Sequence, residues 1–175
     1  MNHAKVFIYS PVENNFLECG RWSDYGEKAH SYQELAFAIR KHGASTKLVE
    51  NSKEIWRRMV FNILVNNNDD HLRNIGFLWN SQGGFELSPC YDIVPMPSVS
   101  QHRTLQLRVG IKGRIASIEN ALSEIHSYSL TKESAEKIIQ EIIYCIKNWE
   151  EYFKKSFEKT TFDYHYFESA FWKER

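Results

Sequence analysis

The longest regular pattern in the chain is a broad stripe of apolar residues at helical spacing. Its members are Ile55, Trp56, Met59, Val60, Ile63 and Leu64. Two neighbouring rows cover more than one narrow face, which is typical of a helix with other elements around it. Asn51 or Ser52 is expected to begin this helix, and the polar run at 66–70 is expected to end it. The pattern therefore predicts a helix buried deep in the fold.

Further segments carry helix signals. Ser31 and Glu34 have the spacing of a capping box, and Gly43 is expected to end that helix in the left-handed conformation. Ser117 and Thr131 stand before two more apolar stripes, the second of which is long. Helices therefore dominate the predicted secondary structure, and no internal repeat interrupts them.

Strand signals are short by comparison. Residues 75–79 and 85–87 are apolar and flank a turn-like NSQGG, which is a hairpin pattern. Residues 5–9 and 16–22 flank PVENN in the same way, and residues 105–109 alternate as a weaker strand signal. We therefore predict a mainly α fold with a small β-hairpin at residues 75–88.

Composition narrows the class of protein. The 175 residues are about one domain in length, and 42% hydrophobic with 14% aromatic residues disfavours disorder. Lys plus Arg equals Asp plus Glu at 22 each, so direct binding to nucleic acid is not expected. Three widely spaced cysteines form no disulfide or zinc pattern, and neither a signal peptide nor a membrane span is evident. A cytoplasmic protein without membrane contact is expected.

Two polar segments carry the candidate chemistry. The first runs from Asn68 to Asn74 as NDDHLRN, and the second from Ser88 to Pro95 as SPCYDIVP. The buried helix delivers the first into a loop, and the hairpin then returns the chain to the second. Carboxylate and amide oxygens brought together in this way are hard ligands that suit Mg²⁺.

The spacing within these segments is that of a phosphoryl-transfer site. In protein kinases a catalytic Asp is followed, after four residues, by an Asn that holds a metal ion, and a later Asp binds Mg²⁺ as well. Asp69, Asn74 and Asp92 have the same order here. In such a site the first residue faces the attacking hydroxyl while the other two hold the metal over the phosphates.

These motifs resemble the HipA-like kinases, which are bacterial toxin-type serine/threonine kinases with a D-x-H-x-K-N pattern followed by Y-D. NNNDDHLRNIGFLW and FELSPCYDIVP are similar to the catalytic and metal-binding segments of that family. The flanking segments HSYQELAFAIR, LQLRVGIKGRIASIENAL and SLTKESAEKIIQEIIYCIKNW also resemble it, so that residues 30–155 are covered. The resemblance implies a fold like the helical C-terminal lobe of a kinase, with the hairpin next to the catalytic loop.

The resemblance also implies a role for each site residue. Asp69 would be the catalytic base or the residue that orients the hydroxyl, and Asn74 and Asp92 would coordinate Mg²⁺ and through it ATP. His71 falls where conventional kinases place a Lys that steadies the transferring phosphate. Arg73 takes the position of the family's Lys and keeps its charge with a different donor geometry.

The resemblance also bears on the organisation of the chain. Residues 1–29 are expected to be a short β or irregular lead-in, 30–155 the family-like core, and 156–175 an aromatic helical tail of a single domain. No Gly-rich loop after a strand and no strand-borne Lys is found in these 175 residues. The lobe that would cradle the phosphates is therefore expected to be absent, and ATP binding by the chain alone to be weak or absent. A split-gene product, a fragment and a remnant all fit this pattern.

Three functions remain open. The first is transfer of phosphate from ATP to a protein Ser or Thr, with a nucleotide-binding lobe or companion subunit supplied separately. The second is a catalytically dead, kinase-like binding module, and the third is a metal-dependent phosphoesterase. The family implies a DNA-binding antitoxin and a protein substrate of translation as partners. Among the neighbouring residues, Asp70 is interpreted as a surface acid or a partner of the site, Tyr91 as a residue that aims Asp92, and Cys90 as inert.

Overall fold

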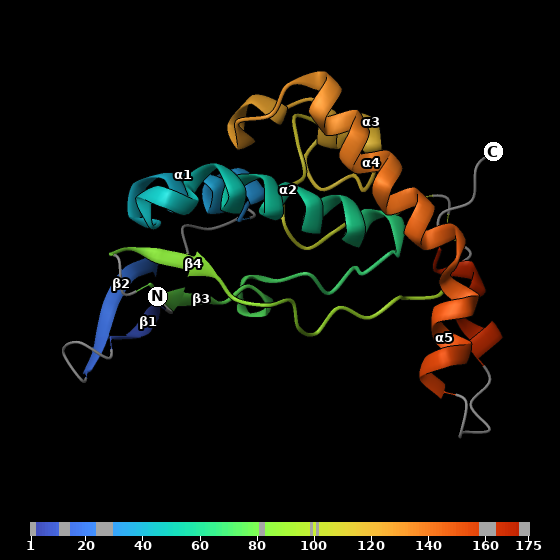
Figure 1. Cartoon of the computed structure of the whole chain (residues 1–175), viewed down its shortest axis with the longest axis horizontal. Helices are drawn as coiled ribbons and strands as arrows, with labels where there is room; N and C mark the ends of the chain where they lie inside the picture. The colour runs from blue at the N-terminus through green and yellow to red at the C-terminus, as the bar shows by residue number, and fades with distance from the viewer. Residues whose placement is uncertain are drawn as a thin grey trace.

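The computed structural model describes residues 3–10, 15–23, 30–80, 83–98, 100, 102–157 and 164–171. Its α-helices are α1 (Tyr32–His42), α2 (Leu48–Leu64), α3 (Ile118–Leu122), α4 (Lys132–Lys147) and α5 (Trp149–Phe157). Short 3-10 helices lie at η1 (Ser45–Lys47), η2 (Leu72–Asn74), η3 (Ile125–Tyr128) and η4 (Tyr164–Ser169). Figure 1 shows α2 near the centre, with α4 on one side of it and the extended segments that follow α2 and β4 on the other. The prediction of a mainly α fold is confirmed.

The strands form two separate antiparallel hairpins. β3 (Phe77–Trp79) pairs with β4 (Phe85–Leu87), so the hairpin predicted beside the candidate loop is confirmed, with a shorter first strand. β1 (His3–Ser10) pairs with β2 (Asn15–Ser23), as the pattern of the first residues predicts. Residues 105–109 are not a strand. The alternating apolar residues of this segment are nevertheless buried, namely Leu105, Leu107 and Val109. The alternation therefore indicated which residues are buried, although the segment makes only isolated β-bridges.

The start of α1 is the capping box that the sequence predicts, but its end differs. The Ser31 side chain accepts a hydrogen bond from the Glu34 backbone, and the Glu34 side chain accepts one from the Ser31 backbone. Gly43 is extended, with φ −71° and ψ 157°, so the left-handed stop predicted there is wrong. Glycine is needed for space instead, because a Cβ at this position would lie 2.5 Å from the Ile39 carbonyl oxygen.

α2 begins earlier than predicted. It continues directly from η1 at Leu48, and Asn51 and Ser52 are buried within its first turns rather than capping it. The reason is that η1 already turns the chain in the helical direction, so the helix has no separate side-chain cap. Its end at Leu64, just before the polar run, agrees with the prediction.

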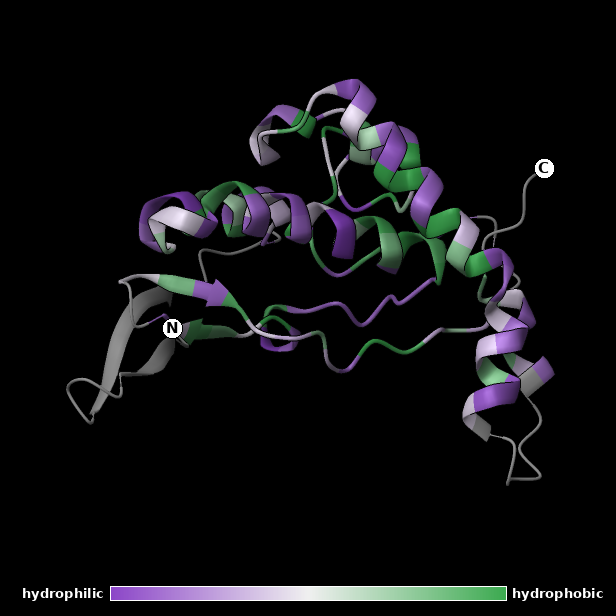
Figure 2. Ribbon diagram, in the orientation of Figure 1, coloured by the Kyte–Doolittle hydropathy of each residue, from purple (hydrophilic) through white to green (hydrophobic). Residues whose placement is uncertain are grey.

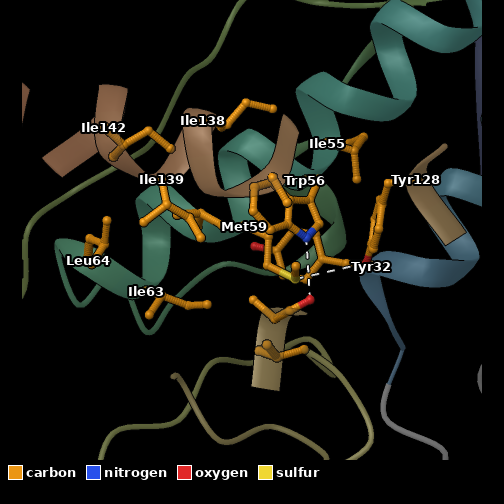
Figure 3. Close-up of a cluster of buried hydrophobic side chains, with 14 of the residues drawn as sticks. Tyr32, Ile55, Trp56, Met59, Ile63, Leu64, Tyr128, Ile138, Ile139 and Ile142 are labelled. Carbon is orange, nitrogen blue, oxygen red and sulfur yellow. Dashed lines mark hydrogen bonds between the residues drawn. The ribbon is translucent and has the colours of Figure 1, made fainter. Parts of the chain in front are cut away.

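The core forms around α2. Every member of its apolar stripe is buried, from Ile55 at 0% exposure to Ile63 at 5%. Figure 3 shows these side chains meeting the isoleucines of α4, and Figure 2 shows both helices alternating between hydrophobic and hydrophilic residues. Trp56 donates its indole N–H to the Ala121 carbonyl at 3.4 Å, which satisfies the one polar atom of a fully buried ring. The deep helix predicted from the stripe is confirmed.

The later helices close the core. Ser117 and Thr131 cap α3 and α4 as predicted, each accepting a hydrogen bond from a backbone N–H three residues on. The aromatic tail packs back on α5, where Trp149 stacks on Phe171 with ring centroids 4.5 Å apart. η4 covers part of the predicted helical tail, and Phe162 and Trp172 lie outside the described residues. In the part of the chain that the structure describes, no helix has the length and apolar character required to span a bilayer.

Candidate functional site

The candidate loop begins with a sharp change of direction after α2. Asn66 has a positive φ of 53°, a conformation that Asn tolerates better than most residues. The Asn67 backbone N–H donates to the Asn62 carbonyl at 2.9 Å, which closes the end of the helix. From there the chain runs in an extended path back below α2 and into the short helix η2 (Figure 1).

Asp69 and Asp70 are adjacent in sequence but lie in opposite environments. The Asp69 side chain is 70% exposed, whereas Asp70 is 2% exposed. Asp70 Oδ2 accepts a hydrogen bond of 2.6 Å from the Tyr32 hydroxyl, and its Oδ1 accepts one of 2.6 Å from the Gln106 backbone N–H. The interpretation of Asp70 as a surface acid is therefore wrong. Its burial beneath the loop agrees with the other interpretation, a partner of the site.

The environment of Asp70 favours a proton. Burial raises the pKa of this carboxyl from 3.8 to about 6, although the bonds from Tyr32 and Gln106 act in the opposite direction. Burial and the neighbouring carboxylate also raise the pKa of Tyr32 well above its usual value, so its hydroxyl remains a donor. Above about pH 6 the pair thus holds one buried charge, on Asp70, beside one neutral phenol.

A chain of hydrogen bonds continues from this pair into α2. Asn62 Nδ2 donates to the Tyr32 hydroxyl oxygen at 2.9 Å, and Asn67 Nδ2 donates to Asn62 Oδ1 at 3.1 Å. All four side chains are at most 6% exposed. The polar network therefore links α1, α2 and the candidate loop inside the core.

Asn74 and His71 lie against Asp69. The Asp69 carbonyl oxygen accepts hydrogen bonds of 3.0 Å from both the Asn74 side-chain amide and the His71 backbone N–H. His71 Nε2 is 3.8 Å from the Asp69 carboxylate, a long ion-pair distance. His71 Nδ1 is buried and has no hydrogen-bond partner among the described protein atoms. Three of the predicted site residues are thus brought together by short-range bonds of the loop itself.

Asp92 lies on a second segment that is tied to this loop. The Tyr91 hydroxyl donates to the Arg73 carbonyl at 2.8 Å, and the Met96 backbone N–H donates to the Val65 carbonyl at 3.3 Å. Figure 1 shows the two extended segments running side by side. Asp92 itself is exposed, with a left-handed φ of 56°. Among the described residues no hydrogen bond or ion pair joins its carboxylate to Asp69 or Asn74, so their convergence on one metal ion stays a prediction.

Arg58 holds the start of the second segment. Its guanidinium donates to the Ser88 carbonyl at 2.7 Å and to Glu54 at 2.9 Å, and the residue is 8% exposed. A cavity of about 20 Å³ lies between the two segments, a volume that suits a single water molecule. Its polar lining includes Arg58, Asn62, Asn67, Asp70, His71 and Asn74. Cys90 also lines it, and burial raises the pKa of its thiol, which agrees with an inert residue.

Sequence reasoning missed Tyr32, Arg58 and Asn62. Arg58 and Asn62 follow Glu54 at intervals of four, so they form a polar row beside the apolar stripe of α2. Polar residues that continue along a helix predicted to be buried on most sides must find partners there. This row was therefore the available signal for a buried network. Tyr32 carried no such signal, because it is the first residue of a separate helix.

The sequence matches a known family model over most of its length. The model of the HipA-like C-terminal domain matches residues 14–149. The chain belongs to the HipA-like C-terminal domain family. A protein of Haemophilus influenzae named "Putative kinase" is 33% identical over 84 residues. That match covers 46% of this chain and 24% of the relative, so the chain spans about a quarter of the relative's length.

The oxygen donors of the candidate site would suit a magnesium ion that arrives with phosphates. Among the described residues, no three His, Cys, Asp or Glu side chains form a metal-binding group. Mg²⁺ is commonly held by one or two carboxylates, with substrate phosphates and waters completing the octahedron. The Asn74 amide nitrogen is engaged by the Asp69 carbonyl, which leaves the amide oxygen as a ligand. Asn74 and Asp92 suit such a shared site better than a site for the free ion.

Proposed function

We propose that this HipA-like domain supplies the base and the metal ligands of a serine/threonine protein kinase of toxin–antitoxin type. The observation that carries the proposal is the arrangement of the loop at 69–74. It holds an exposed Asp69 carboxylate beside Asn74 and next to the segment that carries Asp92. The relative named "Putative kinase" supports the same class of reaction.

Each site residue has a chemical task in this proposal. Asp69 accepts the proton of a Ser or Thr hydroxyl, or orients that hydroxyl, because its carboxylate faces solvent where a substrate can reach it. Asn74 and Asp92 hold Mg²⁺, which would neutralise charge on the phosphates of ATP. His71 and Arg73 supply donors to the transferring phosphate. His71 is already oriented with Nε2 toward Asp69, and its buried Nδ1 faces away from solvent.

The partners belong to the proposal as well. A lobe outside these 175 residues, on the same or another polypeptide, would cradle ATP, since phosphoryl transfer depends almost wholly on positioning and electrostatics. The protein substrate, a DNA-binding antitoxin and a cytoplasmic location follow from the family resemblance. The alternative is a kinase-like module that binds partners without catalysis.

The test is transfer of labelled phosphate from ATP to Ser or Thr. The 175-residue chain alone is expected to give negligible transfer. The chain combined with a nucleotide-binding lobe of the family, in trans or by fusion, is expected to be active. Asp69→Asn removes the base without changing the shape of the side chain, so activity should fall by about 10²-fold or more.

An exposed acid outside the loop provides a matched control. Glu119 lies on α3, where its side chain pairs with Lys112, and Glu119→Gln should leave transfer unchanged. Full activity of the Asp69→Asn variant would contradict the kinase mechanism. Inactivity of the combined wild-type protein, with ATP bound, would favour the binding module.

A further inference from the structure

Adjacent acids in the loop are held in opposite directions by the fold. Asp69 faces solvent at 70% side-chain exposure, while the next residue, Asp70, is 2% exposed. The backbone between the two acids is itself constrained: residues 68 and 69 form a turn, and the His71 N–H donates to the Asp69 carbonyl at 3.0 Å. Because this backbone is held, a side chain fixed at residue 70 limits the directions in which its neighbour Asp69 can point.

Asp70 is fixed from two separate parts of the molecule. Tyr32 belongs to α1, and Gln106 lies in the segment before α3. The Tyr32 hydroxyl and the Gln106 backbone N–H each donate a hydrogen bond of 2.6 Å to a different oxygen of the Asp70 carboxylate. Hydrogen bonds to an ionised acceptor are shorter and stronger than those between neutral groups. With both oxygens held, the carboxylate has little freedom to rotate, and the backbone at residue 70 is held with it.

The hydrogen-bond network around Asp70 is not explained by a gain in the stability of the core. Removing a carboxylate from water is unfavourable, and an apolar side chain of similar volume often stabilises a core at least as well. Burial acts against the charge at Asp70 despite its two donors. The network is instead continuous with the site: from Tyr32 it reaches Asn62 and Asn67, which precede Asp69 by seven and two positions.

We propose that Asp70 and Tyr32 are positioning residues that fix the orientation of the Asp69 carboxylate toward the substrate hydroxyl. This inference rests on the proposed function for its catalytic part. Its structural part does not, because the effect of Tyr32 on the loop can be measured without any phosphate transfer.

Two buried tyrosines provide a matched pair of variants. Tyr32 and Tyr128 are both 0% exposed, and each loses one hydroxyl on substitution by Phe. The Tyr32 hydroxyl bonds to Asp70, whereas the Tyr128 hydroxyl donates to the Met59 sulfur at 3.9 Å and makes no other hydrogen bond with the described residues. Tyr32→Phe thus disconnects the loop from α1, and Tyr128→Phe controls for the loss of a buried hydroxyl in the same core.

The first readout is the amide spectrum of the full 175-residue chain. In the ¹H–¹⁵N spectrum Tyr32→Phe should shift or broaden the signals of residues 68–74, including the Asn74 side-chain amide. Tyr128→Phe should leave those signals in place and change only signals near η3. Asp70→Asn is the second variant, for use if Tyr32→Phe does not fold. It removes the acceptor of the Tyr32 hydroxyl at nearly constant volume and should disturb the same loop signals.

The second readout is the kinetics of the protein combined with its nucleotide-binding lobe. Tyr32→Phe should lower kcat by about 10- to 100-fold with little change in KM for ATP, because misplacing the base affects the chemical step. Tyr128→Phe should keep wild-type kcat. Equal effects of the two variants, or loop signals that Tyr32→Phe leaves unmoved, would overturn the inference. If the wild-type protein transfers no phosphate, the proposed function fails, and the spectra alone decide whether Tyr32 positions the loop.

Discussion

At the scale of single residues, Asp70 is the position in the loop where the structure differs most from what the sequence indicates. Two consecutive acids after a polar run look like solvated turn residues, and nothing local distinguishes them. The partners of Asp70 are Tyr32 and Gln106, which lie 38 and 36 positions away. The spacing to Asn74 could therefore single out Asp69 as the candidate catalytic residue, but the sequence could not show which of the two acids is buried, because burial depends on contacts between distant segments.

The raised pKa of Asp70 predicts how stability depends on pH. Because the folded state holds this proton up to about pH 6 and the unfolded chain releases it near 3.8, the folded state binds more protons between these values. The contribution of Asp70 to the free energy of unfolding should therefore fall as pH rises through this window. The loss is complete above the folded pKa and amounts to about 3 kcal/mol at most.

Urea unfolding of the wild type and of Asp70→Asn between pH 4 and pH 7 measures this dependence. The difference in unfolding free energy between the two proteins should shift in favour of the variant as pH rises. Other acids titrate equally in both proteins and cancel in the difference. A difference that does not change with pH, or that shifts in favour of the wild type, would show that burial does not disfavour the ionised form of Asp70.

At the scale of elements, local signals predicted most of what was observed. The capping box at Ser31, the caps at Ser117 and Thr131 and the β3–β4 hairpin depend on residues within a few positions of each other, so they can be read from the sequence. The errors arose where a tertiary contact decided the outcome. Gly43 is required by the close approach of the Ile39 carbonyl rather than by a left-handed turn, and a periodic pattern does not report such distances.

Arg58 joins two elements, and its removal should be costly. It connects α2 to the end of β4 through the Ser88 carbonyl while pairing with Glu54. Arg58→Met keeps most of the volume but removes the guanidinium from a partly buried carbonyl and leaves Glu54 only its longer ion pair with Arg57, at 3.7 Å. We expect a loss of about 2–3 kcal/mol in the free energy of unfolding, in the range of hydrogen bonds to charged groups.

The neighbouring arginine is a control for this prediction. Arg57 pairs with Glu141 on α4 at 3.0 Å and, at the longer distance of 3.7 Å, with Glu54, and the side chains of Arg57 and Glu141 are more than 40% exposed. Arg57→Met should therefore cost no more than about 1 kcal/mol, as is usual for surface ion pairs. Chemical denaturation of both variants under the same conditions gives the comparison. Similar losses for the two substitutions would show that the link from α2 to Ser88 is not important for stability.

At the scale of the whole molecule, the fold brings two loops from different parts of the sequence to one side of α2. The loop at 69–74 follows α2 directly, while the segment at 88–96 returns from the hairpin and is held at Ser88, Tyr91 and Met96. Their order and spacing were readable in the sequence. Their side-by-side course was not, because it depends on Arg58 and on hydrogen bonds that Tyr91 and Met96 donate to the backbone carbonyls of residues 73 and 65.

The central claim is that Asp69, Asn74 and Asp92 belong to one site for a metal ion with a nucleotide. The most direct measurement is paramagnetic broadening of the ¹H–¹⁵N spectrum of the chain by Mn²⁺–ATP, which reports even weak binding. Mg²⁺–ATP under the same conditions is the diamagnetic reference. We predict that signals of residues 69–74 and 90–94 broaden together at low Mn²⁺–ATP, while those of α4 stay sharp, and that Asp92→Asn weakens the effect in both loops. Broadening confined to one loop, or centred elsewhere on the molecule, would contradict the account.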